Sequence, residues 1–321
     1  MSMPLLETRS LKKYFKTPAG MLHAVDGVSL TIQEGETLGV VGESGCGKST
    51  LGRTVLRLLE PTGGQVLYRG EDITSFDKKR MFAARQEMQM IFQDPYASLN
   101  PRLSVSEIIA EPLIVGKLCK NAREMNERIS RLMETVGLAP RFAHSYPHEL
   151  DGGRRQRIGI ARALATNPGF IVCDEPVSAL DVSIQAQILN LLMDLQEDKG
   201  LSYMFITHDL SVVKHISSHI AVMYLGQCVE YAETKELFAN PLHPYTRALL
   251  AAIPVIDITR RGKRIETVQG EVTSPIEPAP GCRFAPRCKY ATAACKQEQS
   301  LRRAGDNHWV ACCCACGEDA K

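Results

Sequence analysis

The segment Gly42-Glu43-Ser44-Gly45-Cys46-Gly47-Lys48-Ser49 decides the fold, because it fits the phosphate-binding loop pattern of two glycines separated by four residues and followed by Lys and Ser. A short apolar run at 37–41 precedes it and indicates a buried strand, and apolar residues at helical spacing follow it from 50 to 59. A strand, a glycine loop and a helix in this order are the context that the motif requires. The sequence therefore predicts a nucleotide site rather than a chance glycine-rich turn.

The residue types of this loop explain how it would hold a polyphosphate. Glycines allow backbone N–H groups to turn inward, and the N-terminus of the following helix adds a partial positive charge. We expect Lys48 to reach the β- and γ-phosphates and the Ser49 hydroxyl to bind Mg²⁺. The expected nucleotide-binding residues here are Gly42, Ser44, Gly45, Gly47, Lys48, Ser49 and Thr50.

Length and composition narrow the class of protein. The 321 residues suffice for one large domain or two, and 23% charged residues with a net charge of +2 indicate neither a nucleic-acid-binding surface nor a disordered chain. No apolar run approaches the roughly 20 residues of a membrane-spanning helix, and the N-terminus lacks the layout of a signal peptide. We therefore expect a cytoplasmic protein, with any membrane role being peripheral.

Alternating strand and helix patterns predict an α/β fold. The strand patterns lie at 5–32, 37–41, 65–69, 88–92, 170–173 and 203–206. Between about 100 and 165 the apolar spacing is helical, which indicates an all-helical subdomain inserted in a largely parallel sheet. Beyond a domain of residues 1–255, prolines interrupt a stretch with little periodicity. Residues 256–321 are therefore expected to form a small appendix held together by something other than a hydrophobic core.

Four polar residues stand where strands end. Asp174 closes an apolar strand and is expected to support Mg²⁺, and Glu175 comes next, placed to polarise an attacking water. Gln93 is expected to sense Mg²⁺ or water, and His208 to hydrogen-bond the γ-phosphate. A paired Asp-Glu is often only a solvated turn, but the segment 176–181 that follows it makes a chance match much harder to obtain.

Taken in order, these motifs resemble those of ATP-binding-cassette (ABC) ATPases over roughly residues 5–250. The motifs are the Walker A loop (Gly42–Ser49), the Q-loop (Gln93), the signature (Leu150–Arg154), Walker B (Phe170–Glu175), the D-loop (Ser178–Asp181) and the switch histidine (His208). The resemblance implies a P-loop ABC ATPase fold with a mixed sheet core and a helical subdomain, binding ATP and Mg²⁺. It implies that Glu175 is the general base and that Gln93 and His208 sense the γ-phosphate and water. It also implies that Ser49, Gln93 and Asp174 form the Mg²⁺ site.

A narrower resemblance is to the ATPases of dipeptide/oligopeptide/nickel importers, above all their second ATPase subunit. It rests on the segments 92–102, 224–226, 243–249, 280–288 and 308–312. In that family two different ATPase chains form a head-to-tail heterodimer beneath two membrane-spanning permease subunits. An extracytoplasmic solute-binding protein delivers the solute to the permease. The resemblance implies ATP-driven import of peptides, or of a related solute such as a nickel chelate, at the cytoplasmic face of the inner membrane.

In that family each ATP is bound by one chain's Walker motifs and the other chain's signature. The residues expected to reach the partner chain's nucleotide are Asp151, Gly152, Gly153 and Asp181. An aromatic residue before the first strand pair normally stacks on adenine, and spacing favours Phe15 for this role, with Tyr14 second. The alternative for both is an ordinary strand aromatic.

One departure from the family lies in the signature, which usually begins Leu-Ser-Gly-Gly-Gln and here reads Leu150-Asp-Gly-Gly-Arg154. The usual Ser donates to the γ-phosphate, whereas an ionised carboxylate cannot donate and repels phosphate. Asp151 and Arg154 stand three residues apart on one helix turn, so they can pair, and the guanidinium can take over the phosphate contact. We therefore expect the ATP site completed by this signature to turn over abnormally.

The chain has eleven cysteines, and seven of them lie between Cys282 and Cys316, which suggests a metal site. Similar importer subunits carry a four-iron four-sulfur (4Fe-4S) cluster on a spacing like that of Cys282, Cys288, Cys295 and Cys312. Zinc is the rival metal, although its Cys ligands are more often two residues apart, and free thiols are the third interpretation. Three further cysteines lie outside the pattern and are either adventitious or alternative ligands: Cys313, Cys314 and Cys316.

Two functions of other classes stay open. One is a soluble ABC ATPase acting on nucleic acid or ribosomes, but such proteins usually fuse two cassettes or insert a long coiled coil, and this chain does neither. The other is an iron–sulfur redox sensor with regulatory ATP binding, which removal of the cluster would distinguish by its effect on ATP turnover. The solute is not readable from this chain, because selectivity lies in the other subunits.

Overall fold

The computed structural model describes residues 3–253 and 273–314, which belong to two compact units. The first unit comprises Met1–Ile32, Thr37–Thr74 and Thr207–Lys321, and the second comprises Gln33–Glu36 and Ser75–Ile206. The C-terminal segment is thus grouped with the N-terminal strands. A domain boundary near residue 255 stays a prediction.

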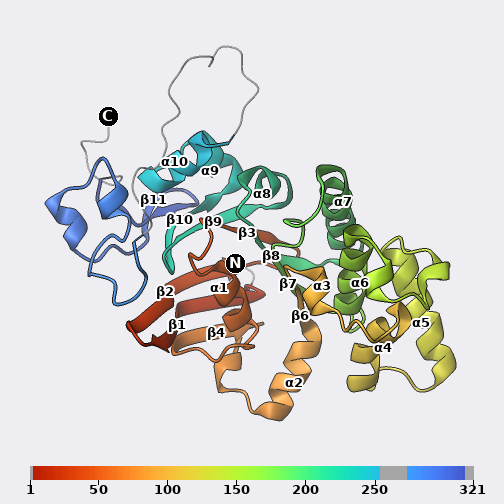
Figure 1. The fold of residues 1–321 in the computed structure, drawn as a ribbon. Coiled ribbons are helices and arrows are strands. Elements are labelled where there is room, and N and C mark those ends of the chain that lie inside the picture. Colours follow the sequence, from red (N-terminus) through yellow and green to blue (C-terminus); the bar gives the residue numbers. More distant parts are fainter. Residues whose placement is uncertain (1–2, 254–272, 315–321) are drawn as a thin grey trace, which may run out of the picture. The chain divides into compact units, whose positions relative to one another are not determined.

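The first unit begins with an antiparallel sheet in the strand order β2-β1-β4-β5 (Figure 1). Val28, Leu30 and Ile32 are buried and alternate with Ser29 and Thr31, the period-two pattern of a strand with one face on the core. The strands predicted at 5–32 and 65–69 are confirmed. The bounds are β1 (Leu6–Thr17), β2 (Gly20–Ile32), β4 (Gly63–Tyr68) and β5 (Glu71–Asp72).

This unit also contributes strands to a second sheet, in the order β11-β12-β10-β9-β3. β3 (Thr37–Val41) is buried along its whole length and pairs in parallel with β9 (His219–Tyr224). The remaining pairs of this unit are antiparallel. For β9 and β10 (Gln227–Glu233) the cause is their connection, because Leu225 and Gly226 form a turn too short for a parallel crossover. The strand predicted at 37–41 is parallel to its neighbour β9, and the antiparallel strands that follow β9 make the sheet mixed, as the resemblance implies. Its helices are α1 (Lys48–Val55), α8 (Leu210–Ile216), α9 (Thr234–Ala239) and α10 (Pro244–Ala251).

The C-terminal segment is built into the first unit. β12 (His308–Val310) pairs with β10 and with β11 (Arg302–Gly305), so it extends the second sheet. His308 Nε2 lies 2.7 Å from Glu230 Oε1, and both side chains are buried. Within the described residues, β12 therefore lies between β10 and the edge strand β11, and a buried polar pair fixes it. That something other than a hydrophobic core holds residues 256–321 together stays a prediction.

The second unit contains three parallel strands in the order β8-β7-β6. β7 (Phe170–Asp174) and β8 (Ser202–Ile206) are buried at every residue, as expected for parallel strands covered on both faces, and β6 is Met88–Ile91. The helices are α2 (Lys78–Glu87), α3 (Pro95–Ser98), α4 (Val105–Val115), α5 (Ala122–Thr135), α6 (Gly152–Leu164) and α7 (Val182–Lys199).

Helices α4, α5 and α6 contact one another, at the place where the sequence predicts a helical subdomain (Figure 1). The extent of that subdomain, about 100–165, stays a prediction. None of the helices in the described residues has the length and apolar character needed to cross a membrane. Short 3-10 helices lie at Ile73–Ser75, Pro140–Phe142, Pro147–Glu149, Ala285–Arg287 and Ala293–Lys296.

Candidate functional site

The phosphate-binding loop connects β3 to α1 and requires glycine at both ends. Gly42 and Gly47 have φ values of 153° and 102°, in the left-handed region that favours glycine. A Cβ atom at Gly42 would meet the carbonyl oxygen of Met223 at 2.2 Å, and one at Gly47 would meet that of Ala24 at 2.0 Å. Strands β9 and β2 therefore confine the loop on two sides, while Ser44 and Gly45 are exposed at its tip.

Lys48 is buried, and its ammonium is bound to the loop itself. Nζ donates to the carbonyl oxygens of Gly42 at 2.8 Å and Glu43 at 2.9 Å. Helix α1 begins at Lys48, two residues before the predicted start, so Ser49 and Thr50 lie in its first turn. The amides of this turn and the lysine together make a site for anions.

The aromatic residues expected near adenine differ in their surroundings. Tyr14 stacks on His23 with ring centroids 4.0 Å apart, and its hydroxyl donates to Asp26. Burial raises the pKa of Asp26, but hydrogen bonds from Tyr14 and His23 and the charge of Arg283 outweigh it, so this pKa lies below its usual value. Phe15 is half-buried on β1, with Lys13 Nζ 4.9 Å from its ring centroid. Base stacking by Phe15 stays a prediction.

His208 is exposed and follows strand β8 by two residues. The preceding Thr207 is buried, and its amide donates to the carbonyl oxygen of Val40 in β3 at 3.1 Å. This bond fixes His208 beside the strand that leads into the phosphate-binding loop. Its role as a γ-phosphate sensor stays a prediction.

In the second unit, Asp174 and Glu175 stand at the end of β7. Asp174 is fully buried, and Glu175 adopts a φ of 45°, a left-handed backbone uncommon for a residue other than glycine. The amide of Glu175 donates to Ile206 of β8 at 2.9 Å, and Gln93 Nε2 donates to Glu175 Oε2 at 2.8 Å. Strained backbone of this kind persists where surrounding bonds enforce it, and it clusters at functional sites. The structure thus joins the two residues that the sequence predicts as base and sensor.

The signature begins helix α6, and Asp151 is its N-cap. The Asp151 carboxylate accepts from the Arg154 amide at 2.8 Å and forms an ion pair with the Arg154 guanidinium. A Cβ atom at Gly153 would meet Ile184 Cγ2 of α7 at 2.7 Å, so this glycine allows the two helices to approach. The predicted pairing of Asp151 with Arg154 is present, and Gly152 is the first residue of the helix.

Asp181 caps helix α7. Its carboxylate accepts from the Ser183 hydroxyl at 2.7 Å and from the Ile184 amide at 3.0 Å. These two bonds, the first above all, lower the pKa of Asp181. Asp181 is therefore an ionised cap, and its expected contact with a nucleotide stays a prediction.

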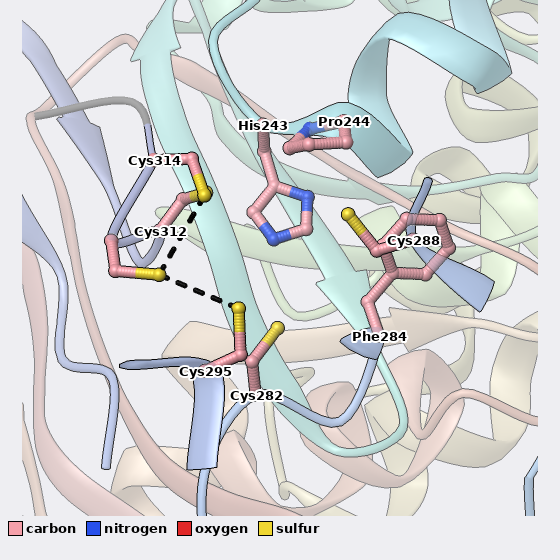
Figure 2. Close-up of a pocket in the computed structure, with 9 residues that line it drawn as sticks. His243, Pro244, Cys282, Phe284, Cys288, Cys295, Cys312 and Cys314 are labelled. Carbon is pink, nitrogen blue, oxygen red and sulfur yellow. Dashed lines mark hydrogen bonds between the residues drawn. The ribbon is translucent and has the colours of Figure 1, made fainter. Parts of the chain in front are cut away.

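Six cysteines of the C-terminal segment line one small cavity, together with His243, Pro244 and Phe284 (Figure 2). The cavity measures about 10 Å³, the room of roughly one water molecule. Among the described residues, the sulfurs of Cys295, Cys313 and Cys314 lie within 4.8 Å of one another. The four cysteines predicted as ligands, Cys282, Cys288, Cys295 and Cys312, all line the cavity, but only Cys295 belongs to this close group.

Cys313 and Cys314, which lie outside the predicted spacing pattern, also line the cavity, so their role as alternative ligands stays open; Cys316 lies outside the described residues. Burial raises the pKa of the Cys282 thiol to about 11. For Cys295 burial also raises the pKa, but hydrogen bonds from the Thr292 amide, Cys313 and the Thr292 hydroxyl outweigh it and lower the value. Cys295 therefore becomes a thiolate ligand more readily than an ordinary cysteine.

His243 was not predicted as a site residue. It is 1% exposed, its Nδ1 accepts from the Tyr245 amide at 3.1 Å, and its Nε2 has no hydrogen-bond partner among the described residues. Burial lowers the pKa of His243 to about 4, so near neutral pH the ring is uncharged with its proton on Nε2. Figure 2 shows this ring among the sulfurs, where it offers a donor to a thiolate. The only signal in the sequence was its place in the segment 243–249.

Comparisons with known proteins match both parts of the chain. A family described as ABC transporter matches residues 25–178, and one described as oligopeptide/dipeptide transporter, C-terminal region, matches residues 229–295. Among solved structures, the ATP-binding cassette MJ0796 in a post-hydrolysis state bound to ADP and Pi has a TM-score of 0.66 and 30% identity. That alignment covers 71% of this chain and 98% of the cassette.

Curated relatives align along nearly the whole sequence. The oligopeptide transport ATP-binding protein AppF of Bacillus subtilis is 51% identical, with 96% of each chain covered. The dipeptide transport ATP-binding protein DppF of Haemophilus influenzae is 49% identical, also with 96% of each chain covered. The oligopeptide transport ATP-binding protein OppF of Escherichia coli is 50% identical, with 95% of this chain and 92% of that protein covered. The chain therefore belongs to the ABC transporter ATPases that carry the oligopeptide/dipeptide transporter C-terminal region.

Proposed function

We propose that this chain is the ATP-hydrolysing subunit that powers a peptide importer. The observation that carries the proposal is its near 50% identity, along almost its full length, to the named oligopeptide and dipeptide transport proteins. The hydrogen bond between Gln93 and Glu175 supports the hydrolytic role, because a general base must be held in a fixed orientation. A related solute such as a nickel chelate is the alternative cargo.

The residues of the site suggest a hydrolysis step with assigned roles. Glu175 would take a proton from the attacking water as the new bond to the γ-phosphorus forms and the bond to the β–γ bridging oxygen breaks. Lys48 and the first turn of α1 would stabilise the negative charge on the phosphates. Mg²⁺, supported by Ser49, Gln93 and Asp174, would neutralise charge on the β- and γ-oxygens.

The proposed assembly is a heterodimer with a second ABC ATPase, docked on two permease subunits at the cytoplasmic face of the inner membrane. An extracytoplasmic solute-binding protein would deliver the peptide. The resemblance of the signature and D-loop to those of the family supports the dimer, since in the family these motifs complete the partner's ATP site. Nucleic acid is not a proposed partner.

For the cysteine cavity we propose a 4Fe-4S cluster held by Cys282, Cys288, Cys295 and Cys312. The donor set supports this, because these four thiols surround one cavity and His243 offers to it an Nε2 proton that has no acceptor among the described residues. A single zinc ion is the second candidate. The close group of Cys295, Cys313 and Cys314 and the small volume favour it.

Glu175→Gln should leave ATP binding intact and slow single-turnover hydrolysis at its site by about 10²–10⁴-fold, the usual loss for a general base. Lys48→Ala should instead weaken the binding of fluorescent ATP. Glu197→Gln, an exposed acid on α7, is the matched control and should change neither quantity. Unchanged hydrolysis in Glu175→Gln would remove Glu175 from the role of base.

Anaerobically purified protein should be brown, with about four irons per chain as this cluster type requires. Serine at Cys282, Cys288, Cys295 or Cys312 should each abolish the colour, because each removes one ligand, while Cys314→Ser should leave it. Elemental analysis of the same variants decides between the metals. Stoichiometric zinc that is lost on Cys313→Ser or Cys314→Ser would replace the cluster with a single-ion site.

Changing Asp151 to Ser together with Arg154 to Gln should raise hydrolysis at the ATP site that this signature completes. Serine keeps the N-cap, so the change removes charge without uncapping α6. Two unit charges about 4 Å apart interact by roughly 4 kcal/mol at an effective dielectric near 20, an upper bound on the repulsion removed.

The measurement is made on the heterodimer with the other site blocked by Glu175→Gln. The control is Asp77→Ser, which replaces the N-cap of α2 in the same way but is not part of the signature and should have no effect. Equal hydrolysis at both sites of the wild-type heterodimer would contradict the expectation that the site completed by this signature turns over abnormally.

A further inference from the structure

The phosphate-binding loop contains a residue that the motif leaves unassigned, Glu43, and the C-terminal segment binds it. Arg287 Nη1 lies 2.8 Å from Glu43 Oε2, and Nη2 lies 3.0 Å from Oε1. The pair is bidentate, the geometry in which a guanidinium binds a carboxylate most strongly. The side chains are 7% and 27% exposed, so solvent screens this pair far less than a surface ion pair.

The backbone of Glu43 is held as well. Its amide donates to the hydroxyl of Tyr245 at 2.8 Å, and its carbonyl oxygen accepts from Lys48 Nζ at 2.9 Å. Tyr245 is fully buried, and its ring packs edge-on against Tyr224 with centroids 4.7 Å apart. The N–H, C=O and carboxylate groups of Glu43 are therefore each bound, two of them by residues some 200 positions away along the chain.

A second arginine of the same segment, Arg283, is linked through Asp26 to Tyr14, one of the two aromatic residues considered for adenine stacking. Arg283 is ion-paired with Asp26 and also donates to the Leu225 carbonyl oxygen. Asp26 in turn accepts from the Tyr14 hydroxyl, one residue before Phe15. Both arginines lie between Cys282 and Cys288, two residues that line the thiol cavity.

We infer that Arg283, Arg287 and Tyr245 are positioning residues of the ATP site, so that the segment Cys282–Cys288 sets how tightly this chain binds nucleotide. Arg287 and Tyr245 hold Glu43, and through it the loop carbonyls on which Lys48 is seated. Arg283 holds Asp26 and hence Tyr14. The inference rests on ATP binding by this family and not on the identity of the solute or the metal.

The test compares fluorescent-ATP dissociation constants, all in a Glu175→Gln background that prevents turnover. Arg287→Gln and Glu43→Gln should each raise the dissociation constant by about 5- to 150-fold, the usual range of coupling between sites. The double variant should be no worse than either single variant, because the two residues act as one unit. Arg303→Gln, whose partner Asp306 is fully exposed in the same C-terminal segment, is the control and should leave the constant unchanged.

A purely stabilising role predicts a different pattern: a lowered unfolding temperature with unchanged ATP affinity, which would overturn the inference. If Arg287→Gln does not fold, Tyr245→Phe decides, because it keeps the buried ring and removes only the hydroxyl. Loss of that one hydrogen bond should raise the dissociation constant about 2- to 12-fold. An unchanged constant in Tyr245→Phe would equally overturn it.

Discussion

The first unit is organised by one constraint: the backbone of the phosphate-binding loop must turn inward at a place with no room for side chains. A Cβ atom on Gly42 would overlap the carbonyl oxygen of Met223, and one on Gly47 would overlap that of Ala24. Lys48 is seated on the loop's own carbonyls, and Arg287 binds the loop carboxylate from outside. A chain of packed rings, Tyr224, Tyr245 and Phe284, then continues from the loop to the thiol cavity.

The parts of this site that were predicted from the sequence are those whose residues belong to short contiguous motifs. The loop, the Asp174-Glu175 pair and the signature each need only a few neighbouring residues with fixed backbone roles, and the buried strands beside them carry a clear pattern. The pairing of Asp151 with Arg154 was also predictable, since residues three apart on a helix are neighbours.

The parts that were missed depend on contacts between distant residues. Arg287 and Glu43 are 244 positions apart, and the segment that carries Arg287 has no strand or helix periodicity from which its position could be read. The joining of β12 to β10 was hidden because a three-residue strand gives almost no pattern. Among the adjacent Cys312, Cys313 and Cys314, the local backbone decides which sulfurs meet Cys295, and spacing alone cannot.

The acidic residue in the signature has a physical explanation within its own helix. Asp151 accepts from the Arg154 amide as an N-cap, a role that serine also fills, and its charge is paired with the Arg154 guanidinium. Compared with the usual signature, Asp151 in place of serine therefore keeps the N-cap of α6 but presents a carboxylate instead of a hydroxyl to the expected nucleotide. Because Asp151 and Arg154 pair, the departures at the two positions are linked.

The central claim is that the C-terminal segment is part of the ATP site. Hydrogen exchange of the wild-type protein, with and without ATP, tests it directly, because the amides of Ala285, Arg287 and Cys288 make local hydrogen bonds that report the opening of this segment. The account predicts that ATP slows exchange in residues 282–288 as well as in the loop 42–50, and leaves the exposed strand β11 unchanged. Slower exchange in the loop alone, with residues 282–288 unaffected, would contradict it.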